Sequence, residues 1–105
     1  MLNLKPNPTL RDFQEYVAQM VKERGFDKET ASEIFMLFFE ECGEMAKAAR
    51  KTQKMRTDKH SEQFHLSHEI ADVFIYLLDI CNYYGVDLEK AFREKEEMNK
   101  KRTWE

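Results

Sequence analysis

Apolar residues recur at helical spacing along most of this chain, in four stretches separated by short polar or glycine-containing segments. In the first stretch, Thr9 can cap a helix whose last turn is closed by Gly25. Its apolar positions are Leu10, Phe13, Val17, Met20 and Val21. This spacing of three and four residues predicts an amphipathic helix. Asp27 can cap a second, longer helix that runs to about Gln53.

The second half of the chain repeats this organisation. A polar, aperiodic segment at 54–60 is predicted to be a loop. Ser61 can cap a third helix that ends at Gly85, and Asp87 can cap a fourth that runs to about Lys101. Since no linker or internal repeat interrupts these elements, we predict a single domain over residues 1–105 with an all-α, four-helix bundle-like fold.

The third predicted helix is apolar around nearly its whole circumference. Its apolar positions are Ile70, Ala71, Val73, Phe74, Ile75, Leu77, Leu78, Ile80 and Cys81. A helix of this kind must be covered on all sides, and three companions of this length can hardly surround it. The sequence therefore predicts a homo-oligomer, a homodimer or a homotetramer, in which a second chain completes the core.

The composition narrows the functional class. With a formal net charge of −3 and a pI of about 5.7, the chain has no broad basic surface for nucleic acid. No apolar run approaches the roughly 20 residues that cross a bilayer, and the first residues lack the pattern of a signal peptide. Cys42 and Cys81 lie in apolar helical patterns, as expected of reduced, buried thiols. These features predict a cytoplasmic protein that binds neither nucleic acid nor membranes.

Two acidic pairs interrupt the apolar stripes of the second and third helices. At about 100° per residue, Glu41 falls in the middle of the apolar stripe of its helix, and Glu44 falls about 60° to one side. Glu69 and Asp72 repeat this arrangement on the third helix. Each pair is spaced i, i+3, so both carboxylates lie on one side of their helix. Glu40 lies nearer the polar boundary, as either a solvated surface acid or a functional one.

Four ionised carboxylates inside a largely apolar bundle repel one another and lose hydration. A hard divalent cation compensates for this, and ligation by oxygen alone favours Mg²⁺ or Mn²⁺ over zinc. For a single acidic pair, contacts with lysine or a tilt toward solvent would be an adequate explanation. Two pairs in matched register favour a metal site.

The inward stripe of the fourth helix changes character along its length. Its successive members are Leu88, Ala91, Phe92, Lys95, Asn99 and Arg102. Apolar side chains thus give way to two cations and an amide. Lysine and arginine beside a metal site suit a polyphosphate, because the metal alone cannot neutralise it. Taken alone, the stripe also fits a solvated C-terminal turn.

Together these residues resemble the signature of the MazG-like nucleotide pyrophosphohydrolases. The match consists of Glu40-Glu41-Cys42-Gly43-Glu44, Glu69-Ile70-Ala71-Asp72 and Lys95-x-x-x-Asn99-x-x-Arg102-x-Trp104. It extends over about residues 34–104. An ExxE or ExxD motif alone carries little information, whereas the three parts in this order are specific.

The resemblance implies a MazG-type all-α NTP pyrophosphatase that uses Mg²⁺ to cleave nucleoside triphosphates to the monophosphate and pyrophosphate, in a homodimer or homotetramer. The substrates would be normal or aberrant nucleotides, with nucleotide-pool house-cleaning as the role. The implied metal ligands are Glu41, Glu44, Glu69 and Asp72. Glu40 would orient or deprotonate the attacking water, beside Glu41. The implied substrate contacts are Lys95, Asn99, Arg102 and Trp104, of which Trp104 fits a contact with a partner subunit equally well.

The sequence also contains motifs typical of other metal sites. Glu62-x-x-His65 occurs once, whereas di-iron bundle proteins carry such a motif on two helices. His60, His65 and His68 lack a fourth zinc ligand at suitable spacing. A phosphoribosyl-ATP pyrophosphohydrolase-like activity and a non-catalytic helical interaction module remain alternatives, although a purely structural bundle gains nothing from four buried acids.

Several aromatic residues near the motifs have two possible roles. Phe35, Phe38 and Phe39 fit either core packing or the wall of a base pocket. Tyr76, one turn after Asp72, fits either a core tyrosine or a residue that reaches the site.

Overall fold

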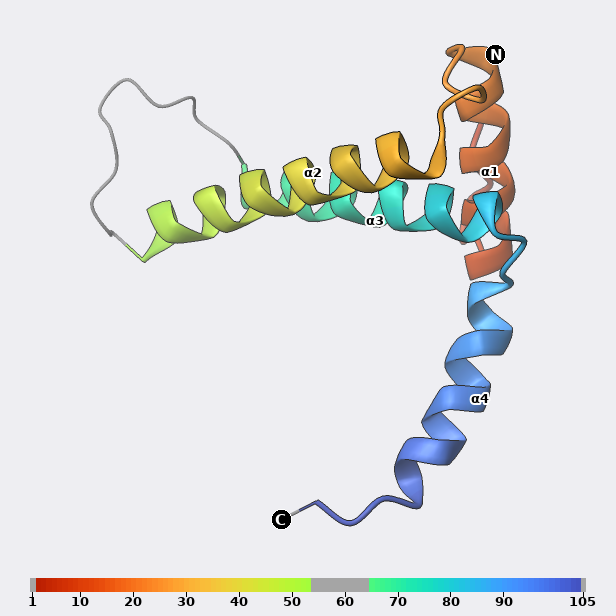
Figure 1. The fold of residues 1–105 in the computed structure, drawn as a ribbon, viewed down its shortest axis with the longest axis vertical. Coiled ribbons are helices and arrows are strands. Elements are labelled where there is room, and N and C mark those ends of the chain that lie inside the picture. Colours follow the sequence, from red (N-terminus) through yellow and green to blue (C-terminus); the bar gives the residue numbers. More distant parts are fainter. Residues whose placement is uncertain (1, 54–64, 105) are drawn as a thin grey trace.

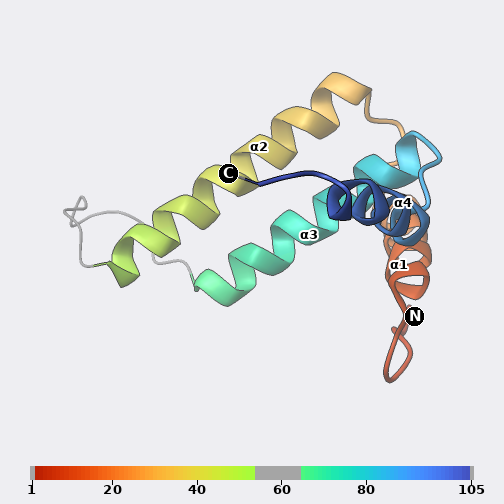
Figure 2. The same ribbon diagram turned by 90° about the horizontal axis from the view of Figure 1, so that it is seen from below.

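A computed structural model describes residues 2–53 and 65–104, and this part of the chain forms four helices without a strand. They are α1 (Leu10–Glu23), α2 (Ala31–Thr52), α3 (Leu66–Tyr83) and α4 (Leu88–Lys100). Helices α2 and α3 run side by side in opposite directions, and α1 crosses the end of this pair where α2 begins and α3 ends (Figure 1 and Figure 2). The predicted all-α fold with four helices is confirmed.

The first two helices begin with reciprocal side-chain caps. The Thr9 hydroxyl accepts a hydrogen bond from the Asp12 N–H, and the Asp12 carboxylate accepts one from the Thr9 N–H. Thr30 and Glu33 form the same capping box at the start of α2. The prediction that Asp27 caps α2 is therefore wrong. A capping box satisfies two backbone N–H groups at once, and only Thr30 has an acid three residues later that completes one.

The later helix boundaries follow the predicted order. Helix α3 begins at Leu66, after His65 in the N-cap position without a side-chain cap bond, and the predicted cap at Ser61 lies outside the described residues, as does the predicted loop. At α4 the prediction is confirmed, because the Asp87 carboxylate accepts a hydrogen bond from the Lys90 N–H. None of the helices in the described residues is long and apolar enough to span a membrane.

The core lies between α1 and α3. Val17 and Met20 of α1 pack on Leu78 of α3, which is fully buried. Burying side chains of this size stabilises the fold by roughly 1.5–3 kcal/mol each. The partly buried residues around this cluster are Leu2, Leu10, Phe13, Tyr16, Val21, Phe74, Ile75 and Leu88. This core fixes α3, and with it one wall of the acidic site.

Two amide side chains fix the connection between α3 and α4. Gln14 of α1 donates from Nε2 to the Val86 carbonyl at 2.9 Å and accepts from the Leu88 N–H at 2.8 Å. The Asn82 side chain donates to the Gln14 carbonyl at 2.9 Å and accepts from Gln14 Nε2 at 3.3 Å. We call this arrangement the Gln14–Asn82 clamp. It determines the direction in which α4 leaves the rest of the fold.

Helix α4 extends away from the α2–α3 pair and packs on α1 near its first turn (Figure 1). Large apolar side chains are consequently exposed, such as Phe92 on α4 at 66% and Phe39 on α2 at 65%. Ile70 and Leu77 of α3 are also exposed. These faces agree with the prediction that a second chain covers part of the apolar surface, which stays a prediction.

Candidate metal centre

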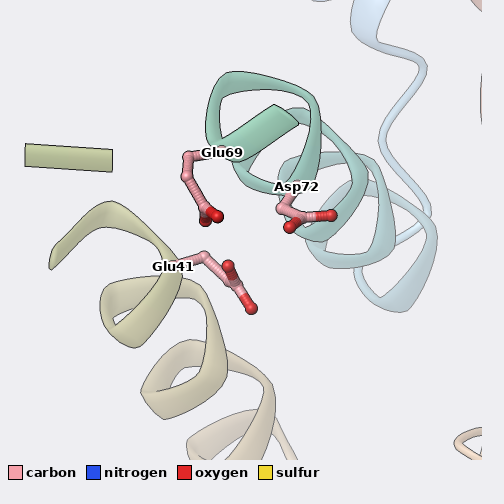
Figure 3. A group of neighbouring side chains, drawn as sticks. All are labelled: Glu41, Glu69 and Asp72. Carbon is pink, nitrogen blue, oxygen red and sulfur yellow. The ribbon is translucent and has the colours of Figure 1, made fainter. Parts of the chain in front are cut away.

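Three of the four predicted ligands form one cluster between α2 and α3. Glu41 extends from α2 toward Glu69 and Asp72 of α3, as Figure 3 shows. One carboxylate oxygen from each of the three lies within 4.8 Å of the others. The antiparallel packing of α2 on α3 brings together two motifs that lie far apart in the sequence. In residues 2–53 and 65–104 this is the one group of three or more such side chains that could hold an ion.

Two oxygens of this cluster are buried without a hydrogen-bond partner. Glu69 is only 7% exposed, whereas Glu41 and Asp72 are half-buried. The atoms without a partner are Glu41 Oε2 and Glu69 Oε2. A buried carboxylate oxygen that lacks a donor loses its hydration without compensation, which is strongly unfavourable for the charged form. The cluster is therefore built for something that supplies positive charge.

The pKa values follow from the same cause. Burial raises the pKa of Glu41 to about 7, helped by a hydrogen bond and the charge of Glu44 and then by the charges of Asp72 and Glu69. Burial also raises the pKa of Glu69, followed by the charges of Glu44 and Asp72. Glu44, the fourth predicted ligand, thus lies close enough to interact with both helices' acids.

The donor set fits a hard divalent cation. It consists of carboxylate oxygens alone, and such a set favours Mg²⁺ or Mn²⁺ over softer metals. The two partnerless oxygens of Glu41 and Glu69 supply the lone pairs that a cation would use. A cation there would also remove the repulsion that raises both pKa values. Glu41, Glu69 and Asp72, with Glu44 beside them, are the residues that would hold it.

The remaining predicted site residues lie elsewhere in the single chain. Glu40 is exposed on α2. Lys95 and Arg102 are exposed on and just after α4, which runs away from the cluster (Figure 1). The Arg102 guanidinium stacks on the Trp104 ring at 4.6 Å from its centroid. One chain alone therefore does not bring the α4 residues to the acids, and their roles stay predictions.

Asn99 nevertheless has an unusual environment on α4. It is half-buried, and its Oδ1 atom is buried without a hydrogen-bond partner. With Lys95 it lines a groove of about 290 Å³ whose apolar wall includes Leu88, Ala91 and Phe92. This is the face that the sequence predicted to point inward; in one chain Leu88 packs on the core, whereas Phe92 and Lys95 are exposed.

Tyr76 connects the cluster to a second acidic region that the motif analysis missed. Burial raises the pKa of Tyr76, followed by the charges of Glu41, Glu29, Asp72 and Asp79. Along α3, Tyr76 lies between Asp72 and Asp79, and it lines a cavity together with Glu29 and Asp79. A signal for Asp79 was present, because it follows Asp72 by seven residues and so lies on the same face of α3. Glu29 lies before α2, where helical periodicity gives no information.

The aromatic residues and cysteines singled out in the sequence lie outside the acidic cluster. The ring of Phe35 contacts the rings of Phe39 and Tyr84, and the ring of Phe38 contacts that of Phe39, while Phe39 itself is 65% exposed. Cys42 and Cys81 are free thiols, and burial raises the pKa of Cys81.

The histidines are only partly described. His65 and His68 are exposed with their rings 5.1 Å apart. Glu62 and His60 lie outside the described residues, so the di-iron and zinc motifs are only partly visible.

Comparisons with known proteins identify the family of the chain and a similar fold. Residues 29–103 match the MazG nucleotide pyrophosphohydrolase domain. A stretch of 44 residues is 41% identical to the dATP/dGTP diphosphohydrolase of Cyanophage S-2L, and it covers 42% of this chain and 42% of that protein. The fold is similar to the crystal structure of YPJD from Bacillus subtilis, a candidate pyrophosphatase, with a TM-score of 0.78. That similarity covers 94% of this chain and all of YPJD at 20% identity, so it concerns the fold alone.

Proposed function

Because the chain belongs to the family of MazG nucleotide pyrophosphohydrolase domains, we propose that it hydrolyses nucleoside triphosphates to the monophosphate and pyrophosphate with Mg²⁺ as its cofactor. The reaction adds water across the anhydride between the α- and β-phosphates. One observation carries the proposal: Glu41, Glu69 and Asp72 converge with two buried oxygens that lack any partner. A helical protein with a purely structural role has no use for such a cluster.

The cation would neutralise phosphate oxygens and stabilise the charge that develops as the anhydride breaks. Three acidic residues of the chain, Glu41, Glu69 and Asp72, would hold this cation in place. Glu69 and Asp72 extend from α3, where Glu69 is buried, and Glu41 extends toward both from α2 (Figure 3). Glu40, one residue before Glu41 and exposed to solvent, is proposed to orient the attacking water or accept its proton.

The positive half of the site is proposed to come from α4 of another copy. Lys95 and Arg102 would contact phosphate oxygens, and Asn99 would use its partnerless Oδ1 on the substrate or on the partner. Exposed Phe92 and Phe39 supply apolar surface for such an assembly. We propose a homodimer or homotetramer in which α4 of one chain faces the acidic cluster of another, with Trp104 at the same contact.

Substrate scope and role belong to the same proposal. Turnover of purine deoxynucleotides is the first case to test, since the cyanophage relative is named for dATP and dGTP. Removal of aberrant or surplus nucleotides in the cytoplasm is the proposed role.

The experiment is a panel of normal and damaged (d)NTPs incubated with the protein and Mg²⁺, with pyrophosphate release as the readout. The expected result is turnover of at least one nucleotide that disappears in Asp72→Ala. Glu23→Gln, which changes an exposed acid on α1, is the matched control and should retain full activity. Absence of pyrophosphate release across the whole panel, with activity on phosphoribosyl-ATP alone, would replace the proposal with that related activity. No activity on either would leave a binding module.

A further inference from the structure

A second buried carboxylate lies beside the metal cluster and has no structural partner. Asp79 of α3 is 8% exposed, and it makes none of the hydrogen bonds or ion pairs found in residues 2–53 and 65–104. Burial raises the pKa of its carboxyl. Helix α3 folds without any contribution from this charge, so Asp79 reduces the stability of the free protein.

Two adjoining cavities open onto this carboxylate. One has a volume of about 100 Å³ and is bounded by Met20, Val21, Arg24, Phe26, Glu29, Ile75, Tyr76 and Asp79. The other, of about 220 Å³, shares with it Val21, Phe26, Glu29 and Asp79. Both therefore combine an aromatic ring, an aliphatic wall and a buried carboxylate. Planar rings are bound in this kind of pocket, by stacking on one face and hydrogen bonds at one edge.

The distance between the cavities and the acidic cluster of Glu41, Glu69 and Asp72 suits the length of a nucleotide. Asp79 follows Asp72 by seven residues, which is two turns along the same face of α3 and about 10 Å along its axis. Tyr76 lies between them and is affected by the charges of both acidic regions. A nucleotide whose phosphates lie at Glu41, Glu69 and Asp72 would extend its base over about this length.

We propose that the pocket between Phe26 and Asp79 binds the nucleobase, and that the Asp79 carboxylate selects a guanine-type edge. This inference rests on the proposed function for the position of the phosphates. An ionised carboxylate offers two acceptors side by side, which match the adjacent N1–H and 2-amino donors of guanine. Adenine and cytosine each place an acceptor beside their amino group, and uracil and thymine flank one N–H with two carbonyls. In all four, an acceptor would face the carboxylate.

Glu29 and Phe26 complete the pocket from the segment between α1 and α2. Burial raises the pKa of Glu29, and the charges of Asp79 and Glu33 raise it further. A base that donates two hydrogen bonds to Asp79 would compensate the buried negative charge of this carboxylate, which is the same charge that raises the pKa of Glu29. Phe26 is 48% exposed and supplies a ring face for stacking.

Equilibrium binding tests this inference without turnover. We expect calorimetry to give a dissociation constant for dGMP about 10- to 100-fold lower than for dIMP, which lacks only the 2-amino group. Asp79→Asn replaces one acceptor by a donor at nearly constant volume and should abolish this difference. Glu23→Gln should keep it. Phe26→Ala changes an exposed ring and should weaken both nucleotides alike, which tests the cavity independently of Asp79.

Two results would overturn the inference: equal affinity of the wild-type protein for dGMP and dIMP, or a preference for dGMP that persists in Asp79→Asn. The wild-type comparison decides even if a variant fails to fold. Turnover of dGTP and dITP with Mg²⁺ separates this inference from the proposed function. Equal turnover of both would contradict base selection and leave the hydrolase intact. Selective binding of dGMP without turnover of any nucleotide would contradict the hydrolase and leave the base pocket.

Discussion

The α2–α3 pair and α4 carry opposite charges of the proposed site, and the single chain places them differently. Between α2 and α3, Glu41, Glu69 and Asp72 already lie within 4.8 Å of one another at partly buried positions. On α4, Lys95 and Arg102 are exposed on a helix that projects away (Figure 1). The acids repel one another, so packing has to hold them together before any cation binds. Lys95 and Arg102, by contrast, would attract the proposed polyphosphate substrate, so a second chain could bring them to the site when the chains assemble. The difference implies that each chain forms the acidic part of the proposed site by itself, and that two chains together complete the basic part. We call Glu41, Glu69 and Asp72 the metal half, and Lys95 and Arg102 the phosphate half.

The largest effect should come from breaking the metal half. Asp72→Ala or Glu69→Ala should lower kcat/KM by about 100-fold or more, because charge stabilisation of this kind is usually the largest contribution to catalysis. The same variants should lose the rise in melting temperature that Mg²⁺ gives the wild-type protein. Turnover close to wild type in either variant would contradict a metal site at this cluster.

Breaking the phosphate half should have a smaller and different effect. Arg102→Ala should lower kcat/KM by about 10- to 100-fold through loss of a charge-assisted contact to phosphate. Mg²⁺ should still raise the melting temperature of this variant, since its metal ligands are intact. Steady-state kinetics and thermal melts on the same sample measure both. If Arg102→Ala also lost the response to Mg²⁺, the two halves would not be separable.

Mixing the two kinds of variant tests whether the halves come from different chains. Inactive Glu41→Ala and weakened Arg102→Ala subunits, unfolded and refolded together in equal amounts, should recover about a quarter of wild-type activity in a symmetric dimer, because half of the dimers are mixed and each mixed dimer has one intact site. Each variant refolded alone is the control. No recovery in mixed samples that are demonstrably oligomeric would mean that each site is built by one chain.

The smallest expected effect is a change in folding stability with pH, which arises in the acidic cluster and not on α4. Glu41 has a pKa of about 7 in the folded protein against an ordinary value of 4.5. Between these values the folded state holds more protons than the unfolded state, so without metal its stability should fall as the pH rises through this window. Thermal melts with EDTA should show this decline, and Glu41→Gln should flatten it. Mg²⁺ should restore more stability at about pH 8 than at about pH 5.5, since protons compete with it.

Local signals in the sequence were sufficient for much of this fold and for the centre of its site. Helical periodicity predicted four helices, and the position of Glu41 within its apolar stripe predicted a carboxylate that points inward; in Figure 3 this side chain extends from α2 toward Glu69 and Asp72. The family predicted from the motifs is confirmed by the match over residues 29–103. The helices and the position of Glu41 depend on neighbours within one or two helical turns, for which spacing is informative, whereas the family depends on three such motifs in a fixed order.

The cap of α2, the direction of α4 and the burial of Asp79 were not predicted, because they depend on contacts that helical spacing does not encode. Asp27 and Thr30 are both good capping residues, and the choice depended on Glu33 completing the capping box. The direction of α4 depends on hydrogen bonds between α1 and the end of α3, about 70 residues apart in the chain, that periodicity does not encode. Asp79 was overlooked because it interrupts an apolar run outside the quoted motifs. Its burial becomes apparent only when α1 covers it.

The Gln14–Asn82 clamp controls the orientation of α4 from a position far from the end of that helix. Helix α4 has 13 residues and is therefore about 20 Å long, so a tilt of about 10° at its base would displace its far end by about 3 Å. That displacement is as long as a hydrogen bond. Two uncharged amides thus determine where Arg102 lies, and in the proposed assembly the rigidity of this joint would determine how accurately Arg102 reaches a phosphate group.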